Sequence, residues 1–331
     1  REEQFSFSTF PVRHERGKVR HKTSLSLFGS RITALDGMSV GLGVGIVEED
    51  ARWLLANALA NYAGGETEGF QLTFLLNYMR DDSRYVQISS GANYVGGDFT
   101  GLQGAALANV TTGSVQGFQS SGVFNYVSGS LGGVQSSVVN LSSKINGIQT
   151  GMFNWAGTVN GIQLGMVNIA GQMNGLPLGL INVSRNGGIE LQTWMGGQSD
   201  LNTGLLFRSG PIYTRFSAGT NGGLGLGSST AWSSYGLSLG TRIHIGRFYL
   251  DLDAGVITLD KGSAGVNIRP DDEEPKDRIS PQGRVTLGYE LLPGIALFTG
   301  LGTAVPIDHT DPESSGPARP LFLFGSSLRL F

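Results

Sequence analysis

The stretches Gly-Ile-Gln-Thr-Gly-Met-Phe-Asn (147–154) and Gly-Ile-Gln-Leu-Gly-Met-Val-Asn (161–168) are two copies of the phrase that decides the fold of this chain. The phrase has a glycine, an apolar residue and a glutamine, then small or apolar residues, then an asparagine. It recurs nine times, with closing asparagines sixteen, then fifteen, then fourteen residues apart. A fixed short period predicts a stacked array in which each unit buries its apolar side against its neighbours. The asparagines are Asn61, Asn77, Asn93, Asn109, Asn125, Asn140, Asn154, Asn168 and Asn182, and the glutamines are Gln71, Gln87, Gln103, Gln119, Gln135, Gln149 and Gln163.

Two all-β geometries can use a unit of this length. In a β-solenoid each unit is one coil, and equivalent residues stack about 4.8 Å apart, so recurring amides can form ladders. Alternatively, each unit is one strand of a single large β-barrel. Ser, Thr and Asn in mid-strand are unfavourable against lipid, and the apolar part is shorter than the ~9–11 residues of a membrane strand. The pattern favours the solenoid.

The composition excludes several classes of protein. Gly accounts for 52 of the 331 residues and charged residues for 15%, which is typical of turn-rich β structure. A net charge of −3 gives no global attraction for nucleic acid, and the absence of cysteine excludes disulfides and thiolate metal sites. The four histidines have no metal-ligand spacing, so we expect neither a metal nor a cofactor. No apolar run is long enough for a transmembrane helix, but a membrane β-barrel remains open.

The repeats are unusually poor in charge. Between Asp98 and Arg185 the only charged residue is Lys144. A surface exposed to water normally carries many more Lys and Glu residues. We therefore expect the array to lie against another molecule, with the Gln and Asn ladder as the candidate binding surface.

The chain after residue 186 predicts an antiparallel transmembrane β-barrel of 8–10 strands. Eight candidate strands alternate strictly, and their connections alternate between tight turns and long polar loops, as in outer-membrane barrels. The strand candidates are 189–195, 203–208, 211–218, 235–245, 248–259, 284–291, 295–303 and 320–331.

Strand parity places the charged residues of this barrel on one face. A tight turn at Gly246-Arg247 sets Arg242 across from Asp251 and His244 across from Tyr249. A lumen this narrow holds only side chains, so we expect a neutralising internal network rather than a channel. Its expected members are Glu190, Arg208, Arg215, Arg242, His244, Asp251, Asp253, Arg284, Glu290 and Arg329.

The N-terminal segment, 1–35, contains two alternating stretches around a basic loop. We expect it to form a hairpin, either of the barrel or beside it, followed by the repeat array over 36–186 and the barrel over 187–331. Arg13, Arg16, Lys18 and Arg20 could then contact lipid phosphates.

These features together resemble a known family. The repeat phrase Gly-Phe-Gln-x-x-Gly-x-x-Asn, seen at 117–125, and an alternating C-terminal domain ending in Phe331 resemble the bacterial surface repeat-containing proteins of the cell envelope. The resemblance implies an envelope location and supplies no catalytic residue.

We therefore expect a non-enzymatic outer-membrane protein, with any signal peptide already removed, whose neutral repeats scaffold or bind another envelope component. Its expected partners are outer-membrane lipid or lipopolysaccharide and an envelope protein or glycan. The alternatives are a large neutral pore and a barrel-embedded hydrolase that uses His244.

Overall fold

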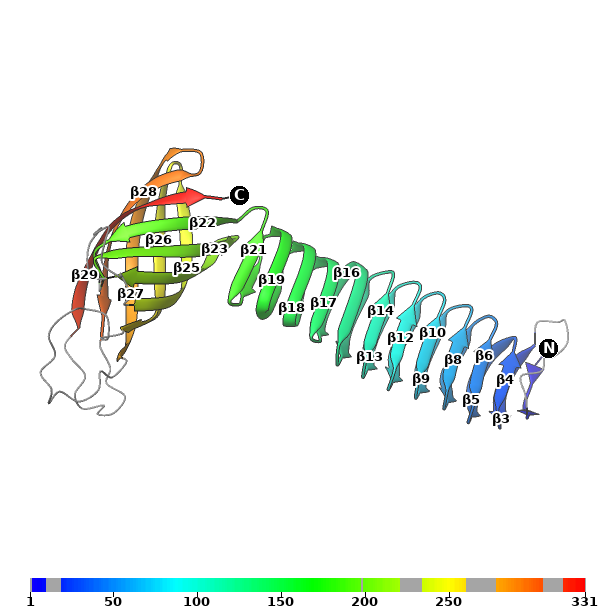
Figure 1. Cartoon of the computed structure of the whole chain (residues 1–331). Helices are drawn as coiled ribbons and strands as arrows, with labels where there is room; N and C mark the ends of the chain where they lie inside the picture. Colours follow the sequence, from blue (N-terminus) through cyan, green and yellow to red (C-terminus); the bar gives the residue numbers. More distant parts are fainter. Residues whose placement is uncertain are drawn as a thin grey trace, which may run out of the picture. The chain divides into compact units, whose positions relative to one another are not determined.

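The computed structural model describes residues 2–9, 19–197, 199–220, 234–259, 278–305 and 318–330. The chain forms two compact units, Arg1–Gly179 and Leu180–Phe331. The first unit is a parallel β-solenoid and the second contains a closed antiparallel barrel (Figure 1). The described residues contain no helix long and apolar enough to cross a membrane.

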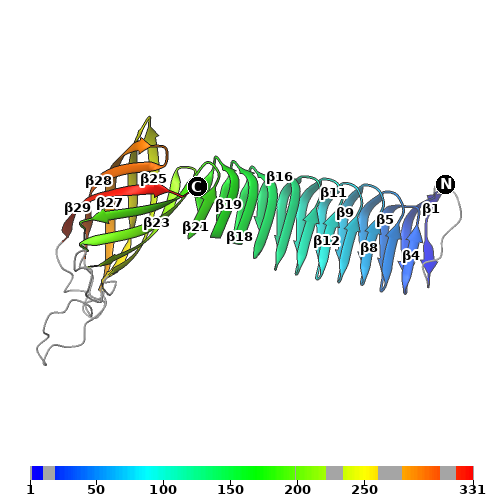
Figure 2. The same ribbon diagram turned by 45° about the horizontal axis from the view of Figure 1, so that its top comes forward.

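Each regular coil of the solenoid consists of one long and one short strand. Figure 2 shows the coils as successive arrows that change from blue to green along the chain. The long strands are β3 (Arg20–Ser26), β5 (Ala34–Gly41), β7 (Ala51–Asn57), β9 (Thr67–Thr73), β11 (Ser83–Ser89), β13 (Phe99–Ala105) and β15 (Val115–Ser121). The short strands are β4 (Gly29–Ile32), β6 (Val44–Val47), β8 (Ala60–Ala63), β10 (Leu76–Met79), β12 (Ala92–Val95) and β14 (Ala108–Thr111).

In the shorter repeats that follow, three of the five strands are 12 or 13 residues long. Each coil loses one residue where a short strand leads into the next long strand, as at the register shift between Val127 and Ser130, and one residue where a long strand leads into the next short strand, so the period falls from sixteen to fourteen residues. These strands are β16 (Phe124–Ser136), β17 (Val139–Ile145), β18 (Ile148–Val159) and β19 (Ile162–Met173), and β20 (Leu176–Leu178) is the last of the first unit.

Equivalent residues of successive coils pair in parallel register. Gln87 pairs with Gln71 on one side and Gln103 on the other, and Asn93 pairs with Asn77. The repeats are therefore coils and not antiparallel wall strands, so the alternative of one large barrel is wrong.

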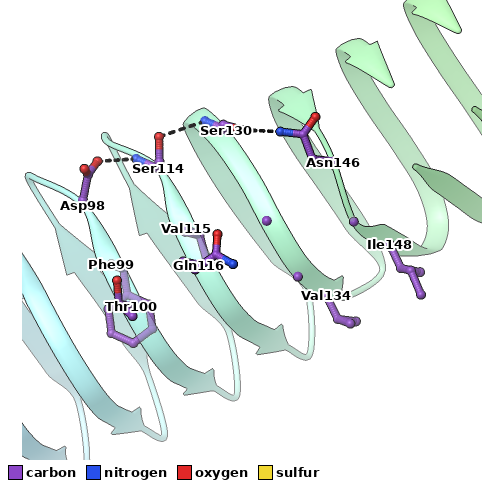
Figure 3. A pocket seen from close by; sticks show the side chains of 13 residues that line it. Asp98, Phe99, Thr100, Ser114, Val115, Gln116, Ser130, Val134, Asn146 and Ile148 are labelled. Atoms are coloured by element: carbon purple, nitrogen blue, oxygen red, sulfur yellow. Dashed lines mark hydrogen bonds between the residues drawn. The ribbon is translucent and has the colours of Figure 1, made fainter. Parts of the chain in front are cut away.

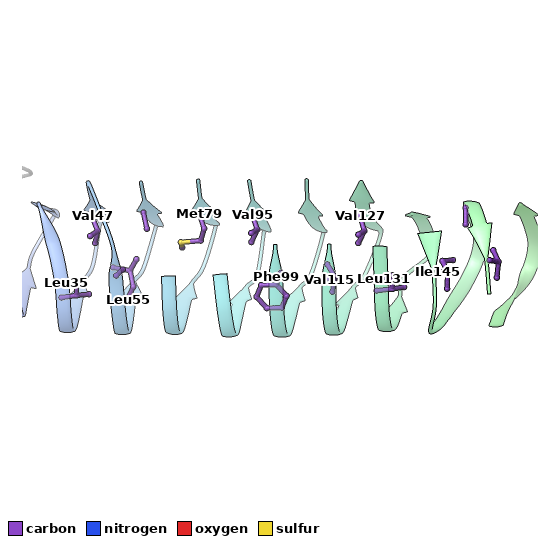
Figure 4. Close-up of a cluster of buried hydrophobic side chains, with 14 of the residues drawn as sticks. Leu35, Val47, Leu55, Met79, Val95, Phe99, Val115, Val127, Leu131 and Ile145 are labelled. Carbon is purple, nitrogen blue, oxygen red and sulfur yellow. The ribbon is translucent and has the colours of Figure 1, made fainter. Parts of the chain in front are cut away.

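The solenoid has a narrow apolar core beside its amide rows. The residue that ends each short strand and the residue that begins the next long strand point inward, as Val95 and Phe99 do, and both are 0% exposed. Figure 4 shows this row of side chains, from Leu35 to Ile145. Each coil contributes only a few apolar groups, so its stability depends on its neighbours.

The predicted N-terminal hairpin is wrong. β1 (Glu2–Glu3) and β2 (Ser6–Ser8) both pair with β3 in parallel, with Ser6 opposite Ser24. A hairpin requires antiparallel strands. The alternating pattern of 5–11 and 22–28 reports which side chains share a face but not the direction of pairing. The solenoid therefore begins well before residue 36.

The second unit begins with β21 (Ile181–Ser184), which packs against two strands of the barrel, β23 and β24. All eight predicted barrel strands are present, and they close in sequence order with β22 beside β29. They are β22 (Gly188–Met195), β23 (Leu201–Ser209), β24 (Ile212–Thr220), β25 (Ser234–Ile245), β26 (Phe248–Leu259), β27 (Arg278–Leu292), β28 (Ile295–Ala304) and β29 (Arg319–Arg329).

Tight turns connect neighbouring strands at one end of the barrel. Gly210, Gly246 and Gly294 lie in these turns with φ of 60°, 66° and 85°, a conformation that favours glycine. The connections 221–233, 260–277 and 306–317 lie wholly outside the described residues, as does Phe331.

Candidate functional site

The repeat asparagines form a ladder inside the solenoid. From Asn61 to Asn154, each Nδ2 donates to Oδ1 of the asparagine one coil further along the chain, at 2.8–3.2 Å, so that Asn168 is the last acceptor. The same Nδ2 also donates to a long-strand carbonyl, as Asn109 does to Ser120 O at 2.7 Å. These asparagines are at most 2% exposed. The asparagine therefore recurs because it satisfies backbone groups at the turn and joins the coils. Asn182, in β21, belongs to the second unit, where it donates to Thr214 Oγ1 at 3.3 Å.

The glutamines form a second buried ladder that runs in the opposite direction. From Gln103 to Gln163, each Nε2 donates to Oε1 of the glutamine in the preceding coil, at 2.6–2.9 Å. Gln71 stands outside this chain of bonds, since its Nε2 donates to Gly69 O at 3.2 Å. Hydrogen bonds aligned in a row polarise one another. Because the two rows point in opposite directions, their side-chain dipoles oppose each other.

These ladders are not the binding surface that the sequence suggested. Their amides are buried and bonded to one another, so they offer no donors or acceptors to a partner. The Gln and Asn phrase is a structural signature, and any partner of the solenoid contacts other side chains.

The outer surface of the solenoid is largely apolar. Outward positions of the short strands carry residues such as Trp155 and Ile169, which are 46% and 41% exposed. Tyr62, Tyr78 and Tyr94 stack on this surface with ring centroids 5.6 Å and 4.6 Å apart. Exposed apolar patches of this kind mark interaction surfaces.

A groove runs across several coils beside the start of the long strands (Figure 3). It has a volume of about 690 Å³, and Gly132, Gly133 and Gly147 leave it open. One side is a row of polar bonds: Ser114 N donates to Asp98 Oδ1 at 2.7 Å, and Asn146 Nδ2 donates to Ser130 Oγ at 3.0 Å. Unlike the inner ladders, this row includes exposed side chains.

Two residues of the outer surface were missed in the sequence analysis. Trp53 and Tyr85 stand at the third position of long strands, where the neighbouring coils have Gly69 and Gly101. Their φ angles are 83° and 86°, which costs a non-glycine residue about 1–2 kcal/mol. Aligning the repeats on this position, and not only on Gln and Asn, would have revealed both.

The barrel interior contains the predicted charge network. Around Asp253, Arg284 Nε donates at 2.9 Å, Tyr213 Oη donates at 2.9 Å, and Arg215 forms a second ion pair. The guanidinium groups of Arg215 and Arg284 each lie 5.7 Å from the Trp194 ring. These side chains are buried, so each charge is held by a partner and not by water.

A second cluster surrounds Arg242. It donates to Glu190 at 2.7 Å and 2.9 Å and to Asp251 at 2.7 Å and 2.8 Å, and its guanidinium lies 3.9 Å from the Tyr249 ring. Arg242 faces Asp251 across the strand pair, as predicted. Arg208 Nε lies 3.6 Å from Glu190 Oε1. Among the described residues, four arginines and three carboxylates therefore share the interior, leaving a net charge of +1.

The other three predicted members lie at the end of the barrel closed by the tight turns. His244 and Arg329 are exposed, and Glu290 Oε1 accepts a hydrogen bond from Gly294 N at 2.9 Å. All three line a small cavity of about 20 Å³. Parity correctly predicted their side of the strands, but they lie beyond the buried network. The described residues show no hydrogen bond from His244 to a serine or a carboxylate, and the hydrolase alternative remains a hypothesis.

The remaining candidates are in the N-terminal region. Arg13, Arg16 and Lys18 lie outside the described residues, and Arg20 is an exposed residue of the solenoid strand β3. Arg20 therefore belongs to a coil and not to a barrel hairpin. In the parts of the chain that are described, no group of three or more His, Asp and Glu side chains could hold a metal ion.

Comparisons with known proteins give little further information. No protein-family model and no curated protein matches the chain. Among solved structures, the chain is similar to the N-terminal β-barrel domain of Pseudomonas aeruginosa OprF, with 9% identity and a TM-score of 0.34. That match covers 44% of this chain and 98% of the other. It is too weak to carry an argument, and the description of the barrel depends on its own strand pairing.

Proposed function

We propose that this chain is a non-enzymatic outer-membrane protein in which the barrel is the anchor and the solenoid binds another component of the envelope. The proposal agrees with the resemblance of the repeats to envelope proteins. It depends chiefly on one observation, the distribution of apolar and charged side chains over the barrel.

The outward faces of the barrel strands are apolar. Leu239, Leu287 and Leu301 are 47%, 51% and 61% exposed, whereas Arg242 and Arg284, on the strands of the first two leucines, are buried. Phe248 and Tyr289 pack together near the tight turns, with ring centroids 4.9 Å apart, and Tyr235 lies toward the other end of the strands. An apolar band with aromatic residues at both edges is what a lipid bilayer requires of a barrel.

The filled interior favours an anchor over a channel. The arginine and carboxylate clusters occupy the space between the strands, and their ion pairs bridge opposite walls, as Arg242 does to Glu190 at 2.7 Å. An eight-strand barrel has room only for such side chains. We therefore propose that the barrel does not conduct ions.

The solenoid supplies the surface for a partner. Lys144 is its only charge between Asp98 and Arg185, and its outer strands expose apolar and aromatic side chains. Such a surface is unfavourable in water and suits an envelope protein or glycan that covers it. Since β22 begins and β29 ends at the tight-turn end, and short turns face the periplasm in outer-membrane barrels, the solenoid would lie in the periplasm.

Protease treatment of a Gram-negative host expressing the protein tests location and orientation together. We expect the protein in the outer-membrane fraction, with a solenoid that is resistant in intact cells and cleaved once the outer membrane is permeabilised. Recovery in the soluble fraction would refute the anchor, and cleavage of the repeats in intact cells would refute the orientation.

A further inference from the structure

The cleft around Gly69 has a construction that the rest of the solenoid lacks. Trp53 and Tyr85 each pair in register with Gly69, one from the preceding coil and one from the following coil. Both aromatic residues have positive φ, and they are the two non-glycine residues within the described ranges that do. Two large side chains thus flank a position with no side chain at all.

The strain at these two positions is not offset by burial. Trp53 is 71% exposed and Tyr85 is 56% exposed, so neither ring contributes much to the core. Glycine fits the same position elsewhere, as Gly101 does with φ of 132°. Strained residues that add little packing are characteristic of binding and active sites.

The backbone also requires a glycine between the two aromatic residues. A Cβ on Gly69 would lie 2.1 Å from Trp53 O, so no other residue fits there without a shift of the backbone. The resulting cleft has a volume of about 660 Å³, within the range of small-molecule sites. Phe70 and Val86 add apolar contacts to its lining.

The spacing of the coils determines what fits between the rings. Two coils at about 4.8 Å each separate the backbones of Trp53 and Tyr85 by about 9.6 Å. A flat aromatic ligand touching both rings at about 3.5–4.0 Å would fill only about 7–8 Å. A puckered saturated ring is thicker and has C–H groups on both faces, so it suits a backbone separation of this size better than a flat ligand does.

The rim of the cleft supplies both donors and acceptors. Asp36, Arg52 and Glu68 line the cleft in adjacent registers, so carboxylate and guanidinium groups alternate along its rim and leave a net charge of −1. Tyr85 Oη also donates to Glu68 Oε1 at 3.4 Å. Alternating donors and acceptors suit hydroxyl groups, which both donate and accept.

We propose that this cleft binds a pyranose ring of a glycan, held between Trp53 and Tyr85 with its hydroxyls at the charged rim. The inference extends the proposed function of the solenoid by assigning a ligand class and a site. The shared chemistry is a sugar ring, which in the envelope occurs both in peptidoglycan and in lipopolysaccharide.

Binding measurements on the full chain in detergent micelles test the assignment. The probes are isolated peptidoglycan, lipopolysaccharide and soluble N-acetylglucosamine oligomers, with choline chloride as a cationic alternative. We expect at least one glycan to bind, and Trp53→Gly and Tyr85→Gly each to weaken that binding tenfold or more. Phe118→Ala, which removes another exposed aromatic residue of the solenoid, is the matched control and should change affinity less than twofold.

Stability measurements distinguish a binding role from a structural one. Because glycine is unstrained at this position, both glycine variants should unfold at the same denaturant concentration as the original protein or a higher one. Marked destabilisation, an unchanged affinity for glycans, or binding of choline but of no glycan would each overturn the assignment. The protease and fractionation experiment tests the membrane anchor independently. A result that refutes glycan binding at this cleft can therefore be distinguished from a result that refutes the proposed function.

Discussion

Replacing Asn109 with alanine tests whether the buried amide ladder holds the coils together. The Asn109 side chain makes three hydrogen bonds: it accepts from Asn93 Nδ2 at 2.8 Å and donates to Ser120 O at 2.7 Å and to Asn125 Oδ1 at 3.0 Å. The residue is 0% exposed, so water does not replace these bonds. Asn109→Ala therefore leaves partners on both neighbouring coils unsatisfied.

The expected loss of stability follows from the number of partners left without a bond. Each unsatisfied buried donor or acceptor costs about 1–3 kcal/mol. Asn125 Oδ1 and one N–H of Asn93 Nδ2, whose other N–H still donates to Gly104 O at 2.6 Å, then lack a partner in the buried interior, so Asn109→Ala should destabilise these coils by about 2–6 kcal/mol. Because each coil contacts only its neighbours, the loss should be largest in the coils on either side of Asn109.

The solenoid contains a matched control on its outer surface. Asn146 also bonds to adjacent coils, donating to Ser130 Oγ at 3.0 Å and accepting from Asn160 Nδ2 at 2.9 Å, but it is exposed. Water can replace these bonds, so Asn146→Ala should cost less than about 1 kcal/mol.

Native-state hydrogen exchange read by mass spectrometry is the appropriate assay, because it measures opening coil by coil. Peptides covering 99–125 should exchange much faster in Asn109→Ala, while Asn146→Ala leaves the equivalent peptides of its own coils nearly unchanged. Equal effects of the two variants would refute the reasoning, because burial would then not determine how much stability these hydrogen bonds contribute.

Three further predictions concern the barrel and the glycines. Asp253→Ala removes the carboxylate shared by the buried Arg215 and Arg284, so it should lower the free energy of unfolding of the barrel in urea by about 3–5 kcal/mol. The control Arg247→Ala, on an exposed turn, should change that free energy by less than about 0.5 kcal/mol. Gly117→Ala places a Cβ 2.1 Å from Gly101 O at φ of 136° and should cost about 1–3 kcal/mol, while at Gly104 the nearest atom is 3.9 Å away and alanine should be nearly neutral in the same exchange assay. Purified protein in planar bilayers should show no stepwise conductance, and reproducible openings would contradict a filled interior.

Much of the fold could be predicted because two different periods are present in the sequence. The sixteen-residue spacing of the asparagines corresponds to one coil, and it explains why Asn77 pairs with Asn93. In the barrel, the alternation with period two and the tight turn at Gly246 correctly placed Arg242 opposite Asp251. In both cases a repeating pattern determines which residues become neighbours.

The pattern could not determine which way an amide faces. Asn and Gln side chains can hydrogen-bond to water at a surface or to one another in an interior. Only the structure, in which Asn93 Nδ2 donates to Asn109 Oδ1, shows that the repeat asparagines bond to one another. The direction of strand pairing was also hidden, since Ser6 and Ser24 alternate in the same way in parallel and antiparallel sheets. Trp53 and Tyr85 were missed because the repeats were compared at their polar positions alone.

Both units follow one physical rule, although they differ in topology. In the solenoid most of the ladder amides bond to one another, and in the barrel Asp253 and Glu190 are paired with arginines, so these buried polar groups find their partners within their own unit. Leucines and aromatic residues then occupy the outward positions of both units. Such outward faces suit the proposal that the barrel faces lipid and that the solenoid binds a partner. The binding specificity of such a solenoid must come from places where its repeat is broken, and Trp53 and Tyr85 are such places.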